Sequence, residues 1–96
     1  MAIKVLFEFK LNENAIDQGK KKLSEILVDT RAFDGCVSVE VVADLKDATH
    51  YVLLETWRSK EHYFAYGKWR AGDGATDLGT FFSAPPAISL FEITDI

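Results

Sequence analysis

One stretch in the second half of the chain carries most of the side chains that could do chemistry. His62, Tyr66 and Arg70 are spaced by four residues and Trp69 precedes Arg70, so a helix would place all of them on one face, with Tyr63 on an adjacent row. Side chains that combine an apolar body with a polar tip can both stack on an aromatic ligand and hydrogen-bond to it. The alternative is that these rings cover a sheet and extend their polar tips into solvent.

The preceding segment adds a carboxylate, because Glu55 and Trp57 lie on the same side of a predicted strand. Among apolar neighbours, Glu55 could have a raised pKa and serve as a base. A structural ion pair with Arg31, Arg58 or Arg70 is the favoured interpretation. Trp57 ends the strand and is a candidate pocket wall, although a buried core position is the more common role.

Composition describes one acidic domain spanning residues 1–96. The chain is 48% hydrophobic and 27% charged with a net charge of −4, and no basic stripe suggests a nucleic-acid partner. No apolar run approaches the roughly 18 residues of a membrane span. Cys36 is the only cysteine, so no disulfide can form within the chain, and we expect a cytoplasmic location. No spaced metal-binding or cofactor-binding motif occurs, so we expect neither a bound metal nor a cofactor.

Hydrophobic periodicity predicts the elements that would position these side chains. Apolar and polar residues alternate as in strands over Ile3–Phe9, Cys36–Ala43, His50–Trp57 and Ala87–Ile93. Helical spacing appears over Ala15–Phe33 and Lys60–Arg70. The order is therefore β-α-β-β-α-β, which predicts a ferredoxin-like α+β fold whose four-stranded antiparallel sheet carries both helices on one face.

Residues at the ends of the helices support these boundaries. Asn12 or Asn14 would cap the first helix, Gly35 would end it, and Ser59 would cap the second. A short helical turn is predicted over residues 77–82.

The uncovered face of this sheet is also apolar. Strict alternation in the second strand places Cys36, Ser38 and Val42 on one face, opposite the face of Val37, Val39 and Val41, and Val52 and Leu54 oppose Tyr51, Leu53 and Trp57. An apolar sheet face of this size is typical of an interface. We therefore predict a homodimer that packs sheet against sheet.

The segments "TRAFDGCVSVEVV" and "YVLLETWRSKEHYFAY" resemble the antibiotic biosynthesis monooxygenase family, within the dimeric α/β barrel superfamily. The matching residues are Arg31, Gly35, Cys36, Glu55, Trp57, Ser59 and Glu61. The motifs cover about Asp29–Tyr66, and the element order extends over the whole chain. The resemblance implies a ferredoxin-like dimer and an oxygenase that oxidises phenolic polyketides or quinols without metal or flavin.

The sequence departs from the family pattern at one important position. Many members carry a histidine where this chain has Tyr66, so a histidine base cannot be transferred there, and His62, one turn earlier, is the candidate substitute. The haem-degrading branch uses an Asn in the first strand and a later histidine. Both are missing here, which argues against haem.

These observations lead to two functional hypotheses. The first is a cofactor-independent monooxygenase for a small aromatic, phenolic or quinol substrate. His62 or Glu55 would be its base, Tyr66 and Arg70 would bind oxyanions, and Trp57, Tyr63 and Trp69 would form the walls. The second is a non-catalytic dimeric module that binds a small hydrophobic ligand or a protein partner. Catalysis requires a titrating group that faces a cavity, whereas binding requires only the walls.

Overall fold

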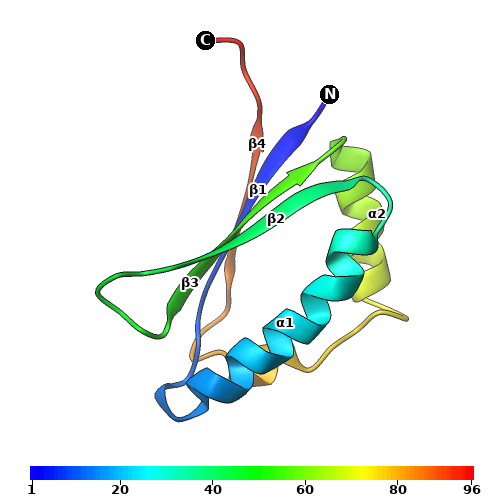
Figure 1. The fold of residues 1–96 in the computed structure, drawn as a ribbon. Helices are drawn as coiled ribbons and strands as arrows, with labels where there is room; N and C mark the ends of the chain where they lie inside the picture. The colour runs from blue at the N-terminus through cyan, green and yellow to red at the C-terminus, as the bar shows by residue number, and fades with distance from the viewer.

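Four strands form one antiparallel sheet in the order β2-β3-β1-β4 in the computed structural model, which describes residues 1–96. The strands are β1 (Ile3–Lys10), β2 (Cys36–Ala43), β3 (His50–Trp57) and β4 (Ala87–Glu92). The helices are α1 (Ile16–Ala32) and α2 (Lys60–Arg70), with short 3₁₀ turns at Glu13–Ala15 and Leu78–Phe81. Both helices lie on the same side of the twisted sheet (Figure 1), which confirms the predicted ferredoxin-like arrangement. None of the helices has the length and hydrophobicity of a membrane span.

The helix-facing side of the sheet holds the core, as the alternation predicted. Buried residues of the adjacent strands β1 and β3 lie side by side on this face, with Val5 paired to Glu55 and Ile3 paired to Trp57. One apolar cluster lies under α1 and a smaller one, around Trp57, lies under α2. Because Trp57 has no exposed surface, its interpretation as a core residue is confirmed.

A β-bulge in β2 corrects one predicted orientation. The pairing with β3 shifts between Cys36, which is opposite Trp57, and Ser38, which is opposite Thr56, so Val37 is an extra residue. An extra residue reverses the alternation at that point. Cys36 therefore lies on the helix-facing side and packs against both apolar clusters, and its predicted place beside Ser38 and Val42 is wrong.

Helix ends agree with the sequence at Ser59 and differ at the other expected positions. The Ser59 hydroxyl accepts a hydrogen bond from the His62 N–H at 3.2 Å at the start of α2. Helix α1 ends at Ala32 with an extended C-cap at Phe33, so Gly35, with a φ of 90°, forms the turn into β2 and does not close the helix. The expected caps Asn12 and Asn14 are wrong, because neither makes a side-chain cap hydrogen bond. A 3₁₀ turn precedes α1 instead, and its Ala15 N–H bonds to the Asn12 backbone carbonyl at 3.0 Å.

No helix covers the opposite side of the sheet, which we call the outer face. Register places five large apolar residues on it: Leu6, Val42, Val52, Leu54 and Phe91. Two of these are clearly accessible, Val42 at 39% and Phe91 at 50%. These residues follow a diagonal that includes all four strands, and Lys4, Glu8 and Glu40 lie beside it on the same face. We call this diagonal the apolar strip.

His50 links two carboxylates beside this outer face. Its Nδ1 lies 2.8 Å from Asp44 Oδ2, and its Nε2 lies 2.5 Å from Glu8 Oε2. The hydrogen bonds to Asp44 and then to Glu8 raise the pKa of His50 above 6.5. Because the pKa of His50 is higher in the folded protein than in the unfolded chain, protonated His50 stabilises the fold. This contribution to stability is fully present below the unfolded-state pKa and is lost as pH rises through the folded-state pKa.

We therefore expect the free energy of unfolding to fall over the pH interval that begins near 6.5, the ordinary histidine pKa, and extends through the higher folded-state pKa, as His50 loses its proton. Urea unfolding at a series of pH values measures this directly. His50→Gln should flatten the dependence in that interval. A wild-type slope that persists unchanged in His50→Gln would show that another group is responsible.

Candidate functional site

Two cavities lie between the helices and the sheet, and they share Leu23 and Leu27 as a common wall. The first, which we call the inner cavity, has a volume of about 300 Å³ and lies among both helices, β1, β3 and β4. The second, the edge trough, measures about 380 Å³ and lies between α1 and β2. Although the edge trough is larger, no carboxyl group lines it. The inner cavity contains a carboxyl, two phenols and a guanidinium, so it is the candidate site.

Glu55 is the carboxyl group of the inner cavity. The residue is only 4% exposed, and its Oε1 accepts a hydrogen bond from Trp57 Nε1 at 2.8 Å. No Arg lies within salt-bridge distance, so the favoured ion pair with Arg31, Arg58 or Arg70 is wrong. Burial raises the pKa of Glu55, and the Trp57 hydrogen bond offsets part of that increase.

The second Glu55 oxygen has no protein partner. The hydrogen bond from Trp57 is the only one that this carboxyl makes, and it uses Oε1. Every side-chain oxygen that is fully shielded from solvent in this protein has a hydrogen-bond partner, so Oε2 is not fully shielded. Oε2 must therefore retain access to the inner cavity that Glu55 lines. A carboxyl with a raised pKa and one free oxygen facing an apolar cavity is suited to exchange a proton with a ligand.

Tyr63 lies beside Glu55 on the α2 side of the cavity. Burial, the nearby Glu55 charge and Tyr66 raise the pKa of Tyr63 to about 12. Its ring meets the Trp57 ring edge-on at 5.6 Å, and its hydroxyl has no hydrogen-bond partner in the protein. At neutral pH Tyr63 is therefore a protonated phenol that can donate to a bound oxygen atom.

A network of three residues holds the far side of the cavity. The Tyr66 hydroxyl lies 2.7 Å from Thr30 Oγ1 and accepts from Arg70 Nε at 2.9 Å, while Arg70 Nη2 donates to Thr30 Oγ1 at 3.0 Å. The Ile26 carbonyl, at 3.4 Å, is the other acceptor for the Thr30 proton, but that distance is long for a hydroxyl donor, so the proton is better placed toward Tyr66. In that arrangement the Tyr66 oxygen accepts twice and its own proton is free for a ligand. Two donors on a phenol oxygen strengthen its O–H as a hydrogen-bond donor.

Arg70 brings a positive charge that no carboxylate neutralises. Its guanidinium donates to the backbone carbonyls of Ile26 at 3.0 Å and Gly74 at 3.1 Å, and it stacks over the Trp69 ring at 4.6 Å. These contacts fix the plane of the guanidinium without cancelling its charge. A cation held rigidly beside an apolar cavity stabilises an anion there more strongly than it would in water.

The remaining predicted site residues lie outside the inner cavity. Trp57 is buried behind Glu55, and Trp69 packs against Phe33 with a ring separation of 5.4 Å. His62 lies at the first turn of α2, where its Nδ1 is 2.7 Å from Ser59 Oγ. Of the predicted residues, the structure thus brings together Glu55, Tyr63, Tyr66 and Arg70 as lining groups.

Thr30 was missed as a functional candidate. It is only 1% exposed and bonds to Tyr66 and Arg70, two of the three polar side chains of α2 that line the cavity. Thr30 follows Leu23 and Leu27 at helical spacing, so the sequence pattern alone places it on the buried face of α1. A buried hydroxyl on such a face needs a partner, which points toward the tyrosines and arginine of the other helix.

Comparison with known proteins places this geometry in a family. The sequence model of the antibiotic biosynthesis monooxygenases matches residues 2–71. The crystal structure of one antibiotic biosynthesis monooxygenase aligns with a TM-score of 0.82 at 21% identity, covering 96% of this chain and 98% of the other. A Mycobacterium tuberculosis protein aligns with a TM-score of 0.80 at 22% identity, covering 100% of this chain and 98% of the other.

A mutant of SnoaB, a cofactor-independent oxygenase from Streptomyces nogalater, aligns with a TM-score of 0.84 at 12% identity, covering 99% of this chain and 95% of the other. At such low identities these alignments show a shared fold. No curated protein sequence matches the chain. Because the family match extends from β1 through the end of α2 and includes most of the cavity, this chain belongs to the antibiotic biosynthesis monooxygenase family.

Proposed function

We propose that the protein is a cofactor-independent monooxygenase that oxidises a small phenolic or quinol substrate with molecular oxygen in the inner cavity. The observation that carries this proposal is the free Glu55 oxygen in an apolar cavity that also holds Tyr63 and the Tyr66–Arg70 pair. Family membership supports the same reaction class.

The first step is removal of a proton from the bound substrate. The raised pKa of Glu55 makes its carboxylate a stronger base than a solvent-exposed one. The developing phenolate or enolate is then stabilised by the Arg70 charge and by hydrogen bonds from Tyr63 and Tyr66. His62 lies outside the cavity, so Glu55 is the base that we favour.

The second step needs no external reductant if the substrate carries an acidic CH₂ group beside a phenolic ring, as in an anthrone. The deprotonated carbon gives electrons to O₂ and forms a carbon–oxygen bond, and the resulting hydroperoxide loses water to leave a carbonyl. The CH₂ carbon supplies the four electrons, so one oxygen atom enters the product and the other leaves as water. The protein therefore needs to supply only the base, the oxyanion donors and an apolar cavity.

A homodimer formed through the outer face is part of this proposal, as is a cytoplasmic location. A second copy is the occupant that we favour because the apolar strip crosses all four strands and no element of the chain covers it. Leu54→Asp should raise the dissociation constant of the dimer, measured by analytical ultracentrifugation, by at least about tenfold. Val28→Asp, on the exposed side of α1, is the matched control that should leave it unchanged.

Oxygen uptake by metal-free, flavin-free protein tests the proposed reaction. A panel of anthrones, hydroquinones and small phenols should include at least one compound whose uptake exceeds that with boiled protein. Tyr66→Phe should lower the rate about 10²-fold, because it removes one oxyanion donor. If the protein binds panel members but no uptake exceeds the boiled control, the result would favour a non-catalytic module that binds a small hydrophobic ligand.

Trp57→Phe should change the pH dependence of turnover. It removes the indole N–H that lowers the pKa of Glu55, so the pKa of the base should rise. The acid limb of the kcat/KM profile, which reports the base in the free enzyme, should therefore move to higher pH. Trp69→Phe, whose ring does not contact Glu55, serves as the control. An unmoved acid limb in Trp57→Phe would remove Glu55 from the role of base.

A further inference from the structure

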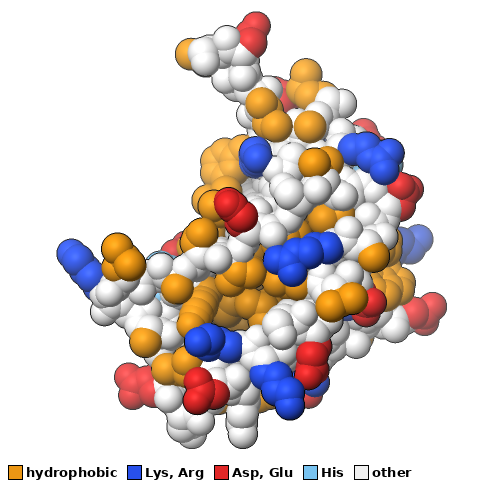
Figure 2. Space-filling view, in the orientation of Figure 1, with side chains coloured by type: hydrophobic (Ala, Val, Ile, Leu, Met, Phe, Trp, Pro, Cys, Tyr) orange, Lys and Arg blue, Asp and Glu red, His pale blue; other side chains and the backbone are white.

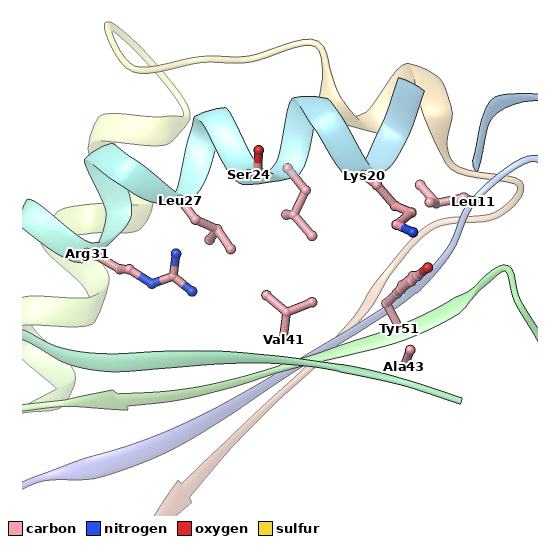
Figure 3. A pocket seen from close by; sticks show the side chains of 9 residues that line it. Leu11, Lys20, Ser24, Leu27, Arg31, Val41, Ala43 and Tyr51 are labelled. Atoms are coloured by element: carbon pink, nitrogen blue, oxygen red, sulfur yellow. The ribbon is translucent and has the colours of Figure 1, made fainter. Parts of the chain in front are cut away.

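The edge trough is an apolar hollow with cationic ends. Val41, Ala43 and Tyr51 form its sheet side, and Leu23 and Leu27 of α1 form the opposite wall. Figure 3 shows Lys20 and Arg31 extending from two separate places along α1 toward the strands. In Figure 2 the hollow appears as an orange surface between helix and sheet with blue side chains around it. Val41, at 42% exposed, leaves apolar surface open to a ligand.

The two charged side chains that line the trough, Lys20 and Arg31, are both positive. Neither Lys20 nor Arg31 has a carboxylate within salt-bridge distance, whereas the neighbouring Lys22 pairs with Asp77 at 3.3 Å. Arg31 is held in place because its Nη2 donates to the Val39 carbonyl at 3.0 Å, which leaves its other N–H groups available. No acidic residue lines the trough. This arrangement is complementary to an anion.

A free polar group inside the trough strengthens this conclusion. Tyr51 is only 8% exposed, and its hydroxyl makes no hydrogen bond to the protein. Since every fully buried side-chain oxygen in the protein has a hydrogen-bond partner, the Tyr51 hydroxyl is not fully buried. Its hydroxyl must therefore open into the trough that its ring lines. In Figure 3 this oxygen points toward the Lys20 end. A phenol and an ammonium group at one end of an apolar hollow can together bind a carboxylate.

We propose that the edge trough is a second binding site, distinct from the inner cavity, for a small amphipathic carboxylate. The apolar tail would lie between α1 and β2 against Leu23 and Val41. The carboxylate would bind at the Lys20 and Tyr51 end, and the Arg31 charge would add a longer-range attraction. A volume of about 380 Å³ is within the range of small-ligand sites. The trough has no carboxyl base, so its role is binding and not the proposed oxidation.

Titration with octanoate tests the site independently of any turnover. Isothermal calorimetry should show binding of octanoate, binding of neutral octanamide at least about fivefold weaker, and none of octylammonium. Octanoate affinity should fall with added salt, because partly exposed charges are screened. In amide NMR spectra, octanoate should shift the signals of Ser24, Val41 and Ala43. Equal affinity for the three compounds, or no octanoate binding at millimolar concentration, would overturn the proposal.

Matched variants locate the binding in the trough. Lys20→Gln and Arg31→Gln should each weaken octanoate binding about two- to fivefold. Lys21→Gln makes the same charge change on an adjacent residue that does not line the trough, and should have no effect beyond the loss of one distant charge. Ala43→Phe keeps every charge but fills the trough from an exposed position, and should abolish binding. Retained binding in Ala43→Phe, or equal losses in Lys20→Gln and Lys21→Gln, would place octanoate elsewhere.

Discussion

Glu55→Gln should lower kcat for substrate oxidation by about 10²- to 10⁴-fold, the usual contribution of a positioned base. Gln has the shape of Glu, so its amide oxygen can still accept the Trp57 N–H and the cavity keeps its volume. The amide has no basic oxygen, and the substrate would have to lose its proton to solvent. The effect should therefore appear in turnover while substrate binding changes little. Steady-state oxygen uptake measures it.

The stability of the same variant separates lost chemistry from lost folding. Because burial raises the pKa of Glu55 in the folded state, its contribution to stability falls as pH rises above the unfolded-state pKa. At neutral pH the buried carboxylate costs free energy that a neutral Gln does not. Glu55→Gln should thus unfold at the same or higher urea concentration than the parent.

His62→Gln is the matched comparison for this assignment. It changes the other candidate base, which lies at the first turn of α2 beside Ser59 and outside the cavity. We expect it to retain most of the turnover. The opposite pattern, with activity lost in His62→Gln and kept in Glu55→Gln, would transfer the role of base to His62 and contradict the proposed site.

Gly35→Ala should destabilise the fold by about 2 to 4 kcal/mol, the largest stability effect that we expect from a single added methyl group. Gly35 has a φ of 90°, which residues with a Cβ rarely adopt. An added Cβ would also lie 2.3 Å from His62 Cβ. Since Gly35 joins α1 to β2 and its carbonyl accepts from the Arg58 N–H at 2.8 Å, the backbone has little freedom to relax.

Gly79→Ala provides the control for this prediction. It adds the same methyl group at a glycine with a negative φ and with no heavy atom close to the new Cβ. Its midpoint of urea unfolding should stay near that of the parent. If Gly35→Ala were as stable as Gly79→Ala, the close packing of α2 against the α1–β2 turn would be incorrect.

Much of the fold could be predicted from local patterns because the physics behind them is local. Two-residue alternation in β1 and β3 predicted the buried faces, since successive side chains of a strand point to opposite sides. Ser59 marked the start of α2 because its hydroxyl can accept from a free helix N–H, and Gly35 marked the turn into β2 because glycine adopts a positive φ readily. The bulge at Val37 escaped prediction because strict alternation assumes one partner for every residue.

The candidate site was only partly predictable. Helical spacing placed Tyr66 and Arg70 on the same face as Trp69, but spacing does not say which part of a face meets a void. That depends on the residues across from it, and Trp69 meets Phe33 of the α1–β2 connection instead of open space. The expected ion pair of Glu55 failed for a similar reason, because Trp57, two residues along the same strand, supplies the hydrogen bond.

Labelling with heavy-isotope O₂ tests the central claim most directly. Metal-free, flavin-free protein would be incubated with an anthrone under the labelled gas, and the product and solvent water analysed by mass spectrometry. We predict one labelled oxygen atom per product molecule, in the carbonyl formed from the CH₂ carbon, one labelled atom in water, and loss of this incorporation in Glu55→Gln. Product formed at the boiled-protein rate, or formed equally by the parent and Glu55→Gln, would contradict an oxygenase that works through the inner cavity.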